Sequence, residues 1–261
     1  MSNRDTTNAD ASLAAIIMAA GKGTRMKSDL PKVAHEVAGA PMVRWVVEAV
    51  RAAGASRIVL VVGHGADIVR DIFAGDDADL EYVVQEQQLG TGHAALCAEP
   101  VLGEFKGDVL VLAGDGPLIR EATIRAMHAR HRDTEAAATL ATSVIDDPTG
   151  YGRIQRGADG RFDAIVEQKN ATPDQLAIRE IYPSYACFDA PTLFSILRSL
   201  EPNELTGEYY VTDVPAIIRR DGGRVEIVDA VPPEDVLSIN TLEQLAEVDA
   251  ILVARQGAST S

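Results

Sequence analysis

The fold class follows from one stretch of sequence, Ala14-Ala-Ile-Ile-Met-Ala-Ala-Gly-Lys-Gly-Thr-Arg-Met-Lys-Ser-Asp-Leu-Pro-Lys32. Its first residues, 14–20, are apolar and mostly small, which is typical of a buried strand in a parallel sheet. Gly21 and Gly23 follow, and a residue without a Cβ lets the backbone turn tightly and approach a ligand closely. Successive backbone N–H groups in such a turn form an anion-binding concavity. The stretch therefore predicts a buried strand that ends in an anion-binding loop.

Four cations lie in or just after this loop, Lys22, Arg25, Lys27 and Lys32, although the formal net charge of the chain is −15. Phosphate is the simplest ligand for such a loop. The glycines do not fit the P-loop pattern G-x-x-x-x-G-K-[ST], and Met26 stands where a dinucleotide-binding fingerprint needs its third glycine. Taken alone, the loop is also compatible with a βα turn whose lysines are simply solvated.

Length and composition narrow the class of protein. The chain has 261 residues, of which 46% are hydrophobic and 24% charged, as is ordinary for a globular domain. Its net negative charge argues against nonspecific binding to nucleic acid or to membrane surfaces. Cys97 and Cys187 form no C-x-x-C motif, so neither a zinc ribbon nor a redox pair is indicated. With no apolar run long enough to span a membrane, we expect a cytoplasmic protein.

Strands alternate with helices in the first half of the chain, and the second half reads as a mixture of strands, a hairpin and helices. This order predicts an α/β fold with a mostly parallel, mixed sheet flanked by helices. We expect one domain over residues 13–254, divided into halves at 13–135 and 136–254, with disordered tails at 1–12 and 255–261. The expected strands are 14–20, 57–63, 80–85, 108–113, 136–144, 150–156, 162–167, 181–189 and 224–228. The expected helices are 41–53, one from 64, one after the glycines at 89–92, 192–200, one within 208–220, and 241–254.

Asp115 follows the strand at 108–113 directly, in Gly114-Asp115-Gly116-Pro117-Leu118. In open α/β sheets, ligands bind at the carboxyl ends of the strands. A carboxylate there, near a phosphate loop, suits Mg²⁺, which favours one or two carboxylates together with substrate phosphates. A helix-capping aspartate is the alternative interpretation of the same residue.

Several separated motifs follow one another along the chain: Met18–Met26 with Ser28–Lys32, Gln85–Ala94, Gly114–Leu118, Gly150–Ile154 with Val166–Lys169, Gly207–Asp213, and Ser238–Asn240. Together they resemble the uridylyltransferase domain of the bacterial N-acetylglucosamine-1-phosphate uridylyltransferases, in the sugar nucleotidyltransferase family. In the G-D-x-P-L motif, this chain has Gly116 where many members have valine. The resemblance spans roughly 14–253 and implies a Rossmann-like nucleotidyltransferase fold, with a nucleotide-binding half at 13–135 and a smaller α+β sugar-binding half at 136–254.

The resemblance assigns roles to individual residues. It implies that Asp115 and Asn240 hold Mg²⁺, that Arg25 contacts the pyrophosphate leaving group, and that Lys32 contacts the phosphates flanking the α-phosphorus. Arg25 and Lys32 are the expected catalytic residues. We interpret His93 as a structural residue, because the attacking sugar phosphate is already ionised and needs no general base. The expected substrate-binding residues are Met18, Ala19, Ala20, Gly21, Gly23 and Gly114 near the phosphates, Gln85, Gly90 and Thr91 at uracil, and Gly152, Glu167 and Tyr182 at the sugar.

One departure from the family bears on the sugar. Members usually have Glu-Ile-Asn-[TS]-Gly, whereas this chain has Glu180-Ile-Tyr-Pro-Ser184, so that Tyr182 replaces an asparagine that touches the sugar. The expected substrates are UTP and N-acetylglucosamine 1-phosphate, and another hexose 1-phosphate is the nearest alternative. A nucleotide-sugar sensor without turnover is a third reading, against which stands the combination of cations with a metal site. A dehydrogenase is a weaker alternative, because this chain lacks the third glycine of the dinucleotide-binding fingerprint.

The resembling bacterial enzymes usually continue into a left-handed β-helix that acetylates glucosamine 1-phosphate. Such a domain needs hexapeptide repeats, because each coil buries its core only against its neighbours. Residues 246–261 contain no such repeat. We therefore expect uridylyltransferase activity without acetyltransferase activity, in a monomer or a small homo-oligomer.

Overall fold

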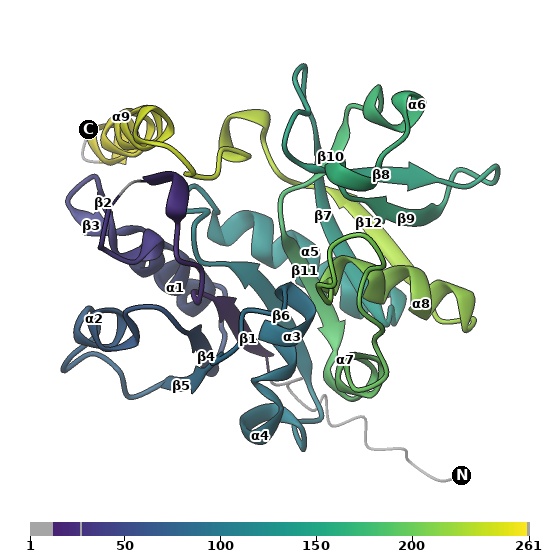
Figure 1. Ribbon diagram of the computed structural model, residues 1–261, viewed down its shortest axis with the longest axis horizontal. Coiled ribbons are helices and arrows are strands. Elements are labelled where there is room, and N and C mark those ends of the chain that lie inside the picture. Colours follow the sequence, from purple (N-terminus) through teal and green to yellow (C-terminus); the bar gives the residue numbers. More distant parts are fainter. Residues whose placement is uncertain (1–12, 27, 260–261) are drawn as a thin grey trace, which may run out of the picture.

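The computed structural model describes residues 13–26 and 28–259, and Figure 1 shows its arrangement. The predicted tail at 1–12 lies outside the described residues. Within them, a ten-stranded sheet runs in the order β5-β4-β1-β6-β11-β7-β10-β8-β9, and β12 pairs with β7. Its strands are β1 (Leu13–Met18), β4 (Arg57–Val62), β5 (Leu80–Val84), β6 (Asp108–Ala113), β7 (Ala138–Val144), β8 (Gly152–Arg156), β9 (Phe162–Val166), β10 (Glu180–Tyr182), β11 (Tyr185–Asp189) and β12 (Val225–Asp229).

The helices and a two-stranded hairpin complete the fold. The hairpin consists of β2 (Glu36–Val37) and β3 (Ala40–Pro41). The α-helices are α1 (Met42–Ala52), α2 (Ala66–Asp71), α3 (Thr91–Leu96), α4 (Glu99–Leu102), α5 (Glu121–Thr134), α6 (Pro173–Leu176), α7 (Ala190–Leu197), α8 (Val214–Arg220) and α9 (Leu242–Ser259). The short 3₁₀ turns are η1 (Thr24–Met26), η2 (Lys32–Ala34), η3 (Gln168–Asn170), η4 (Val211–Asp213) and η5 (Pro233–Asp235).

The sheet changes character along its width. Neighbours among β5, β4, β1 and β6 pair in parallel, as expected for strands joined by helical crossovers. From β11 onward the pairs β6–β11, β11–β7, β7–β10, β10–β8 and β8–β9 are antiparallel, and β12 alone returns in parallel beside β7. The strands of both halves thus form one sheet, whose parallel part carries the loops after β1 and β6.

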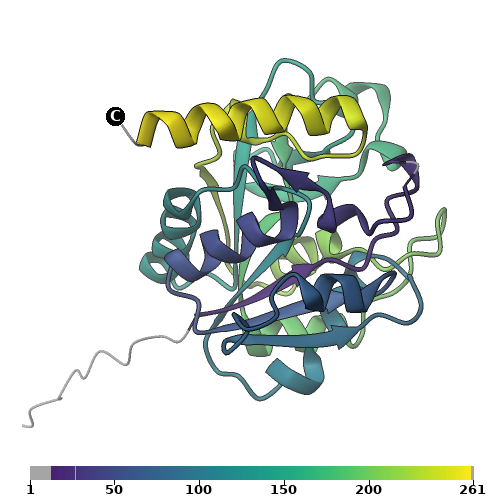
Figure 2. The same ribbon diagram turned by 90° about the vertical axis from the view of Figure 1, so that its left-hand side faces the viewer.

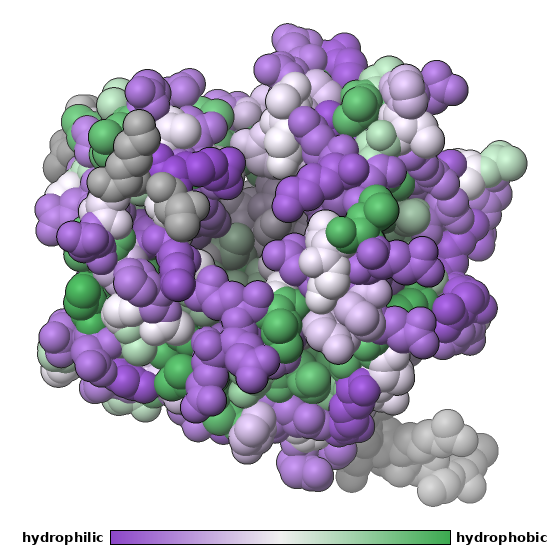
Figure 3. Space-filling model, in the orientation of Figure 1, coloured by the Kyte–Doolittle hydropathy of each residue, from purple (hydrophilic) through white to green (hydrophobic). Residues whose placement is uncertain are grey.

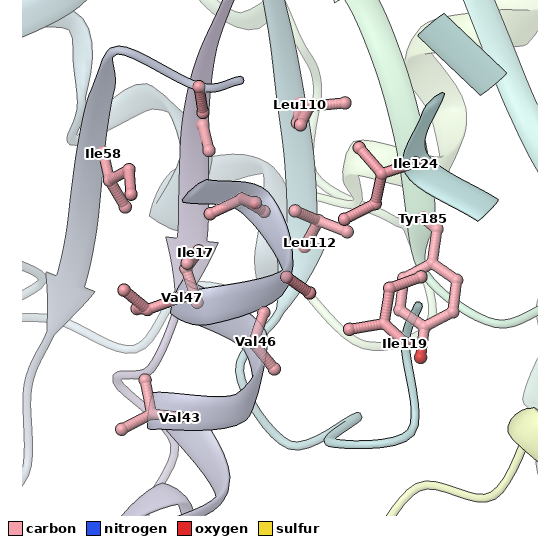
Figure 4. Packing of buried hydrophobic residues seen from close by; sticks show 14 of the residues in the cluster. Ile17, Val43, Val46, Val47, Ile58, Leu110, Leu112, Ile119, Ile124 and Tyr185 are labelled. Carbon is pink, nitrogen blue, oxygen red and sulfur yellow. The ribbon is translucent and has the colours of Figure 1, made fainter. Parts of the chain in front are cut away.

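Helices cover both faces of the sheet because successive side chains of a buried strand point to opposite sides. On β1, Ala15 and Ile17 belong to a core with α1 and α5, part of which Figure 4 shows. Ala14 and Ile16 belong to a second core with α3, α7 and α8. Burying an aliphatic side chain of this size stabilises a fold by about 1.5–3 kcal/mol, so both faces hold the strand in place.

The C-terminal helix corrects the prediction of a disordered tail at 255–261, because α9 continues to Ser259. Arg255 donates to the carbonyl of Leu118 at 3.2 Å and pairs with Asp235, whose side chain is 1% exposed. Figures 1 and 2 show α9 lying across the β2–β3 hairpin, and its residues Val248 and Leu252 join a third apolar cluster there. Residues 260 and 261 lie outside the described part of the chain.

Two further expectations differ from the structure. The strand expected at 181–189 is two strands, β10 and β11, because Ser184 has φ +69° and turns the chain between them. The amphipathic helix α5 was not predicted, although its buried residues Thr123, Ile124, Met127 and His131 recur at helical spacing. No helix among the described residues is long and apolar enough to cross a bilayer.

Candidate active site

A cleft of about 750 Å³ opens beyond the carboxyl ends of β1 and β6, and Figure 3 shows it as a hollow between the two sides of the molecule. Of the expected site residues, the cleft is lined by Met18, Ala20, Gly21, Gly23, Arg25, Lys32, Gln85, Gly90, Thr91, Asp115, Gly152, Glu167, Tyr182 and Asn240. Ala19 and Gly114 do not line it. Instead, the Ala19 amide donates to Val61 O at 2.8 Å and the Gly114 amide to Met18 O at 3.0 Å, so both residues support the wall from behind.

The polar centre of the cleft is formed by side chains that are far apart in sequence. Lys32 Nζ forms an ion pair with the carboxylate of Asp115 and donates to Asn240 Oδ1 at 2.8 Å. Arg25 Nη2 donates to the same oxygen at 2.7 Å. Two cations and two oxygen-bearing side chains therefore meet at one point, where an anionic ligand and a hard cation could both be held.

Local backbone geometry brings these groups together. Gly23 has φ +62°, and a Cβ there would lie only 2.6 Å from Lys32 Cβ, so the glycine lets the loop fold onto Lys32. On the opposite wall, the Ile239 amide donates to Asp115 O at 3.3 Å. This hydrogen bond ties the loop after β6 to the segment that carries Asn240.

Asp115 and Asn240 fit a magnesium ion by their chemistry. Their side-chain oxygens converge on the ammonium of Lys32, which shows that a single cation can contact both. No group of three or more His, Cys, Asp or Glu residues that could hold a metal occurs in the described part of the chain. Mg²⁺ does not need such a group, because it commonly takes one or two protein oxygens and completes its shell with phosphates and water.

At one end of the cleft, the side-chain amide of Gln85 is suited to bind a nucleobase. Gln85, which is 5% exposed, donates through Nε2 to Gly90 O at 3.0 Å, and the same nitrogen lies 3.1 Å from His93 Nδ1. Its amide nitrogen is therefore engaged within the protein, and its carbonyl oxygen remains to accept a hydrogen bond from a ligand N–H. Gly90 has φ +102°, and a Cβ there would lie 2.5 Å from Tyr209 O.

The other end lies on the antiparallel strands. Tyr182 on β10 pairs with Gly152 on β8, and Glu167 accepts a hydrogen bond from Thr212 Oγ1 at 2.9 Å. Burial and the nearby Glu167 carboxylate raise the pKa of Tyr182 above its ordinary value. The phenol therefore stays protonated and can act as a hydrogen-bond donor at the cleft wall.

A buried arginine holds the loop on this side. Arg153 is 2% exposed, donates through Nη1 to Tyr151 O, and donates through Nη2 to Gln168 Oε1 at 3.1 Å. The same Gln168 oxygen accepts from the Gly150 amide at 2.6 Å. These hydrogen bonds fix the backbone of residues 150–152 where it borders the cleft.

Sequence reasoning missed other residues of the cleft, including Gln88, Tyr151 and Gln244. Gln88 Nε2 donates to Ala20 O, and Gln244 Oε1 accepts from the Asn240 amide at 2.8 Å. Gln88 lies in a run of similar residues, and Gln244 lies on the polar first turn of α9. Neither carried a local signal that distinguishes a ligand-facing amide from a solvated one.

Comparison with known proteins bears on the family and the fold. The family of MobA-like NTP transferase domains matches residues 15–198. The bifunctional protein GlmU of Geobacter metallireducens is 50% identical over 235 residues, which are 90% of this chain and 49% of that protein. GlmU of Geobacter sulfurreducens is 49% identical over the same length. The chain spans about half the length of these curated relatives.

Solved structures support the predicted fold. A UDP-glucose pyrophosphorylase complexed with UDP-glucose superposes with a TM-score of 0.72 at 17% identity, covering 94% of this chain and 99% of that one. An apo UDP-glucose pyrophosphorylase gives a TM-score of 0.76 at the same identity and coverage. The expected Rossmann-like nucleotidyltransferase fold is thereby confirmed. Since the family match also covers most of the sequence, this chain belongs to the MobA-like NTP transferase domain family.

Proposed function

We propose that this protein is a uridylyltransferase that converts UTP and N-acetylglucosamine 1-phosphate into UDP-N-acetylglucosamine and pyrophosphate. The observation that carries the proposal is the meeting of Arg25 and Lys32 with the oxygens of Asp115 and Asn240 in one cleft. The identity of about half the residues with the GlmU proteins supports it, as does the set of motifs. The two free cysteines, Cys97 and Cys187, suit a cytoplasmic enzyme.

The residues of the cleft define a nucleotide end and a sugar end. Gln85 would accept a hydrogen bond from the uracil imide, and the loop after β1 would bind the phosphates through its backbone N–H groups. Gly152, Glu167 and Tyr182 would contact the sugar. The α-phosphorus would then lie between the two ends, beside Lys32 and Asp115.

The reaction requires positioning more than proton transfer. A phosphate oxygen of the sugar 1-phosphate attacks the α-phosphorus in line, a new P–O bond forms, and the bond to the β-phosphate breaks as pyrophosphate leaves with its electron pair. Lys32 would hold the phosphates that flank the α-phosphorus, and Arg25 would stabilise the charge that develops on pyrophosphate. A bound Mg²⁺, held by Asp115 and Asn240, would neutralise phosphate charge.

One observation favours a second sugar. Tyr182 is 5% exposed and cannot reproduce the paired donor and acceptor of an amide. A hexose 1-phosphate that needs only one hydroxyl contact at this position, such as glucose 1-phosphate, is therefore the alternative substrate.

The test is pyrophosphate release from UTP with N-acetylglucosamine, glucosamine or glucose 1-phosphate, with and without Mg²⁺. We expect the highest kcat/KM with N-acetylglucosamine 1-phosphate and no turnover when the metal is chelated. A preference for glucose 1-phosphate would support the alternative. Release with none of the sugars would contradict the proposed function.

A further inference from the structure

Gly116 lies on the cleft wall beside Asp115, directly against the phenol of Tyr185. A Cβ at position 116 would lie 2.6 Å from the Tyr185 hydroxyl oxygen, a separation that real Cβ atoms essentially never show. The next ring atoms are 3.4 and 3.5 Å away, which is ordinary contact. Gly116 is not among the glycines with positive φ, so its backbone would accept an alanine. One oxygen atom of Tyr185 is therefore what excludes a side chain here.

Tyr185 cannot easily move away from this position. It is 1% exposed, begins β11, and pairs with Leu112 on β6. Figure 4 shows its ring beside Ile119 in the core that α1 and α5 cover. Burial is the main reason why the pKa of Tyr185 is raised, so the phenol stays neutral in the folded protein.

The loop above Tyr185 is fixed on both sides of Gly116. The Gly114 amide donates to Met18 O at 3.0 Å, and the Ile119 amide donates to Gly116 O at 3.3 Å. Asp115 O accepts from the Ile239 amide, next to Asn240. An atom inserted between Gly116 and Tyr185 would therefore push on the peptide that carries the Asp115 carboxylate.

We propose that Gly116 is a positioning residue for Asp115: it is the glycine that lets the loop Gly114–Leu118 lie directly on the phenol oxygen of Tyr185, so that a side chain at position 116 would displace the Asp115 carboxylate. The inference rests on the proposed function, because the role of Asp115 as a metal ligand gives its position a chemical consequence. Tyr185 itself does not line the cleft.

The experiment compares Gly116→Ala, Tyr185→Phe and the double variant with the wild type. The readout is the dissociation constant of Mn²⁺ in the presence of UTP, measured by electron paramagnetic resonance without sugar phosphate. We expect Gly116→Ala to weaken Mn²⁺ binding by about tenfold or more, since even a small displacement of the Asp115 carboxylate would weaken its contact with the ion. Tyr185→Phe should stay within about twofold of the wild type, and the double variant should recover to that level because the clashing oxygen is gone.

Gly257→Ala is the matched control, since a Cβ there meets nothing within 4 Å. The proposal is overturned if Gly116→Ala binds Mn²⁺ like the wild type, or if the double variant binds as weakly as Gly116→Ala. A lower melting temperature of Gly116→Ala with unchanged Mn²⁺ binding also overturns it, because the contact between Gly116 and Tyr185 would then affect stability only. Should Gly116→Ala fail to fold, recovery of folding and Mn²⁺ binding in the double variant supports the proposal, and failure of both variants to fold overturns it. An inactive wild type would count against the proposed function instead, and the Mn²⁺ titration would still test the contact between Gly116 and Tyr185.

Discussion

The ammonium of Lys32 contacts the carboxylate of Asp115 directly, although the two residues lie on loops that follow different strands. The side chains of both are largely buried, at 13% and 22% exposure. The carboxylate therefore faces a cation. In the proposed reaction, phosphates would draw Lys32 toward themselves and leave the Asp115 carboxylate to a metal ion.

Replacing Asp115 by Asn should lower kcat by about a hundredfold or more, because the proposed phosphate site would lose its charged metal ligand. The melting temperature should change little. Steady-state measurements at saturating Mg²⁺ give the kcat of the variant. Asp159→Asn, in the exposed β8–β9 turn, is the control. A variant with the wild-type rate would show that Asp115 is not a metal ligand.

Replacing Arg25 by Ala should reduce kcat far more than it raises KM for UTP, if its contact strengthens as charge develops on pyrophosphate. Lys22→Ala is the matched control, since Lys22 belongs to the same loop but does not line the cleft. A change in KM alone would assign Arg25 to ground-state binding.

Replacing Tyr182 by Phe removes a hydroxyl at the sugar end of the cleft and leaves the ring. Loss of one hydrogen bond of about 1 kcal/mol should raise KM for the sugar 1-phosphate about fivefold and leave KM for UTP unchanged. Tyr82→Phe removes a buried hydroxyl on β5 as a control. An equal rise in KM for both substrates would show that the Tyr182 hydroxyl does not contact the sugar specifically.

Replacing Arg255 by Ala should lower the free energy of unfolding by about 3 kcal/mol, because the buried Asp235 loses one of its two arginine partners, the other being Arg120. Urea unfolding followed by circular dichroism measures this loss. Arg220→Ala, whose side chain is 72% exposed, is the control and should be nearly neutral. If Arg255→Ala and the wild type had the same free energy of unfolding, the packing of α9 would not depend on this contact.

Asp108 should make stability depend on pH. Burial by itself would raise the pKa of Asp108, but hydrogen bonds from His128 and His131 outweigh it and hold that pKa well below its ordinary value. The stabilisation is therefore present above the unfolded-state pKa of about 4 and is lost as the pH falls through the lower folded-state value.

The difference in unfolding free energy between wild type and Asp108→Asn should accordingly be present above a pH of about 4 and should shrink as the pH falls below that value. Urea titrations across this range give the comparison. A difference that grows as the pH falls below about 4 would have the wrong sign for a carboxylate whose pKa is lowered by folding.

The sequence by itself determined those features whose physical cause is local. The sequence showed the apolar run at 14–20, the glycines of the following loop, and Asp115 after β6, because backbone freedom and strand burial are reflected in adjacent residues. Parallel strands then place the ends of β1 and β6 at one edge, which brought Lys32 and Asp115 together as expected.

Tertiary structure alone decided features that depend on contacts between distant segments. The extension of α9 depends on Arg255 meeting Asp235 and Leu118. The placement of Gln88 and Gln244 in the cleft likewise had no local signal. Nothing in the motif around Gly116 reveals that a phenol from β11 fills the space beneath it, because steric exclusion is a property of two surfaces and is absent from either segment alone.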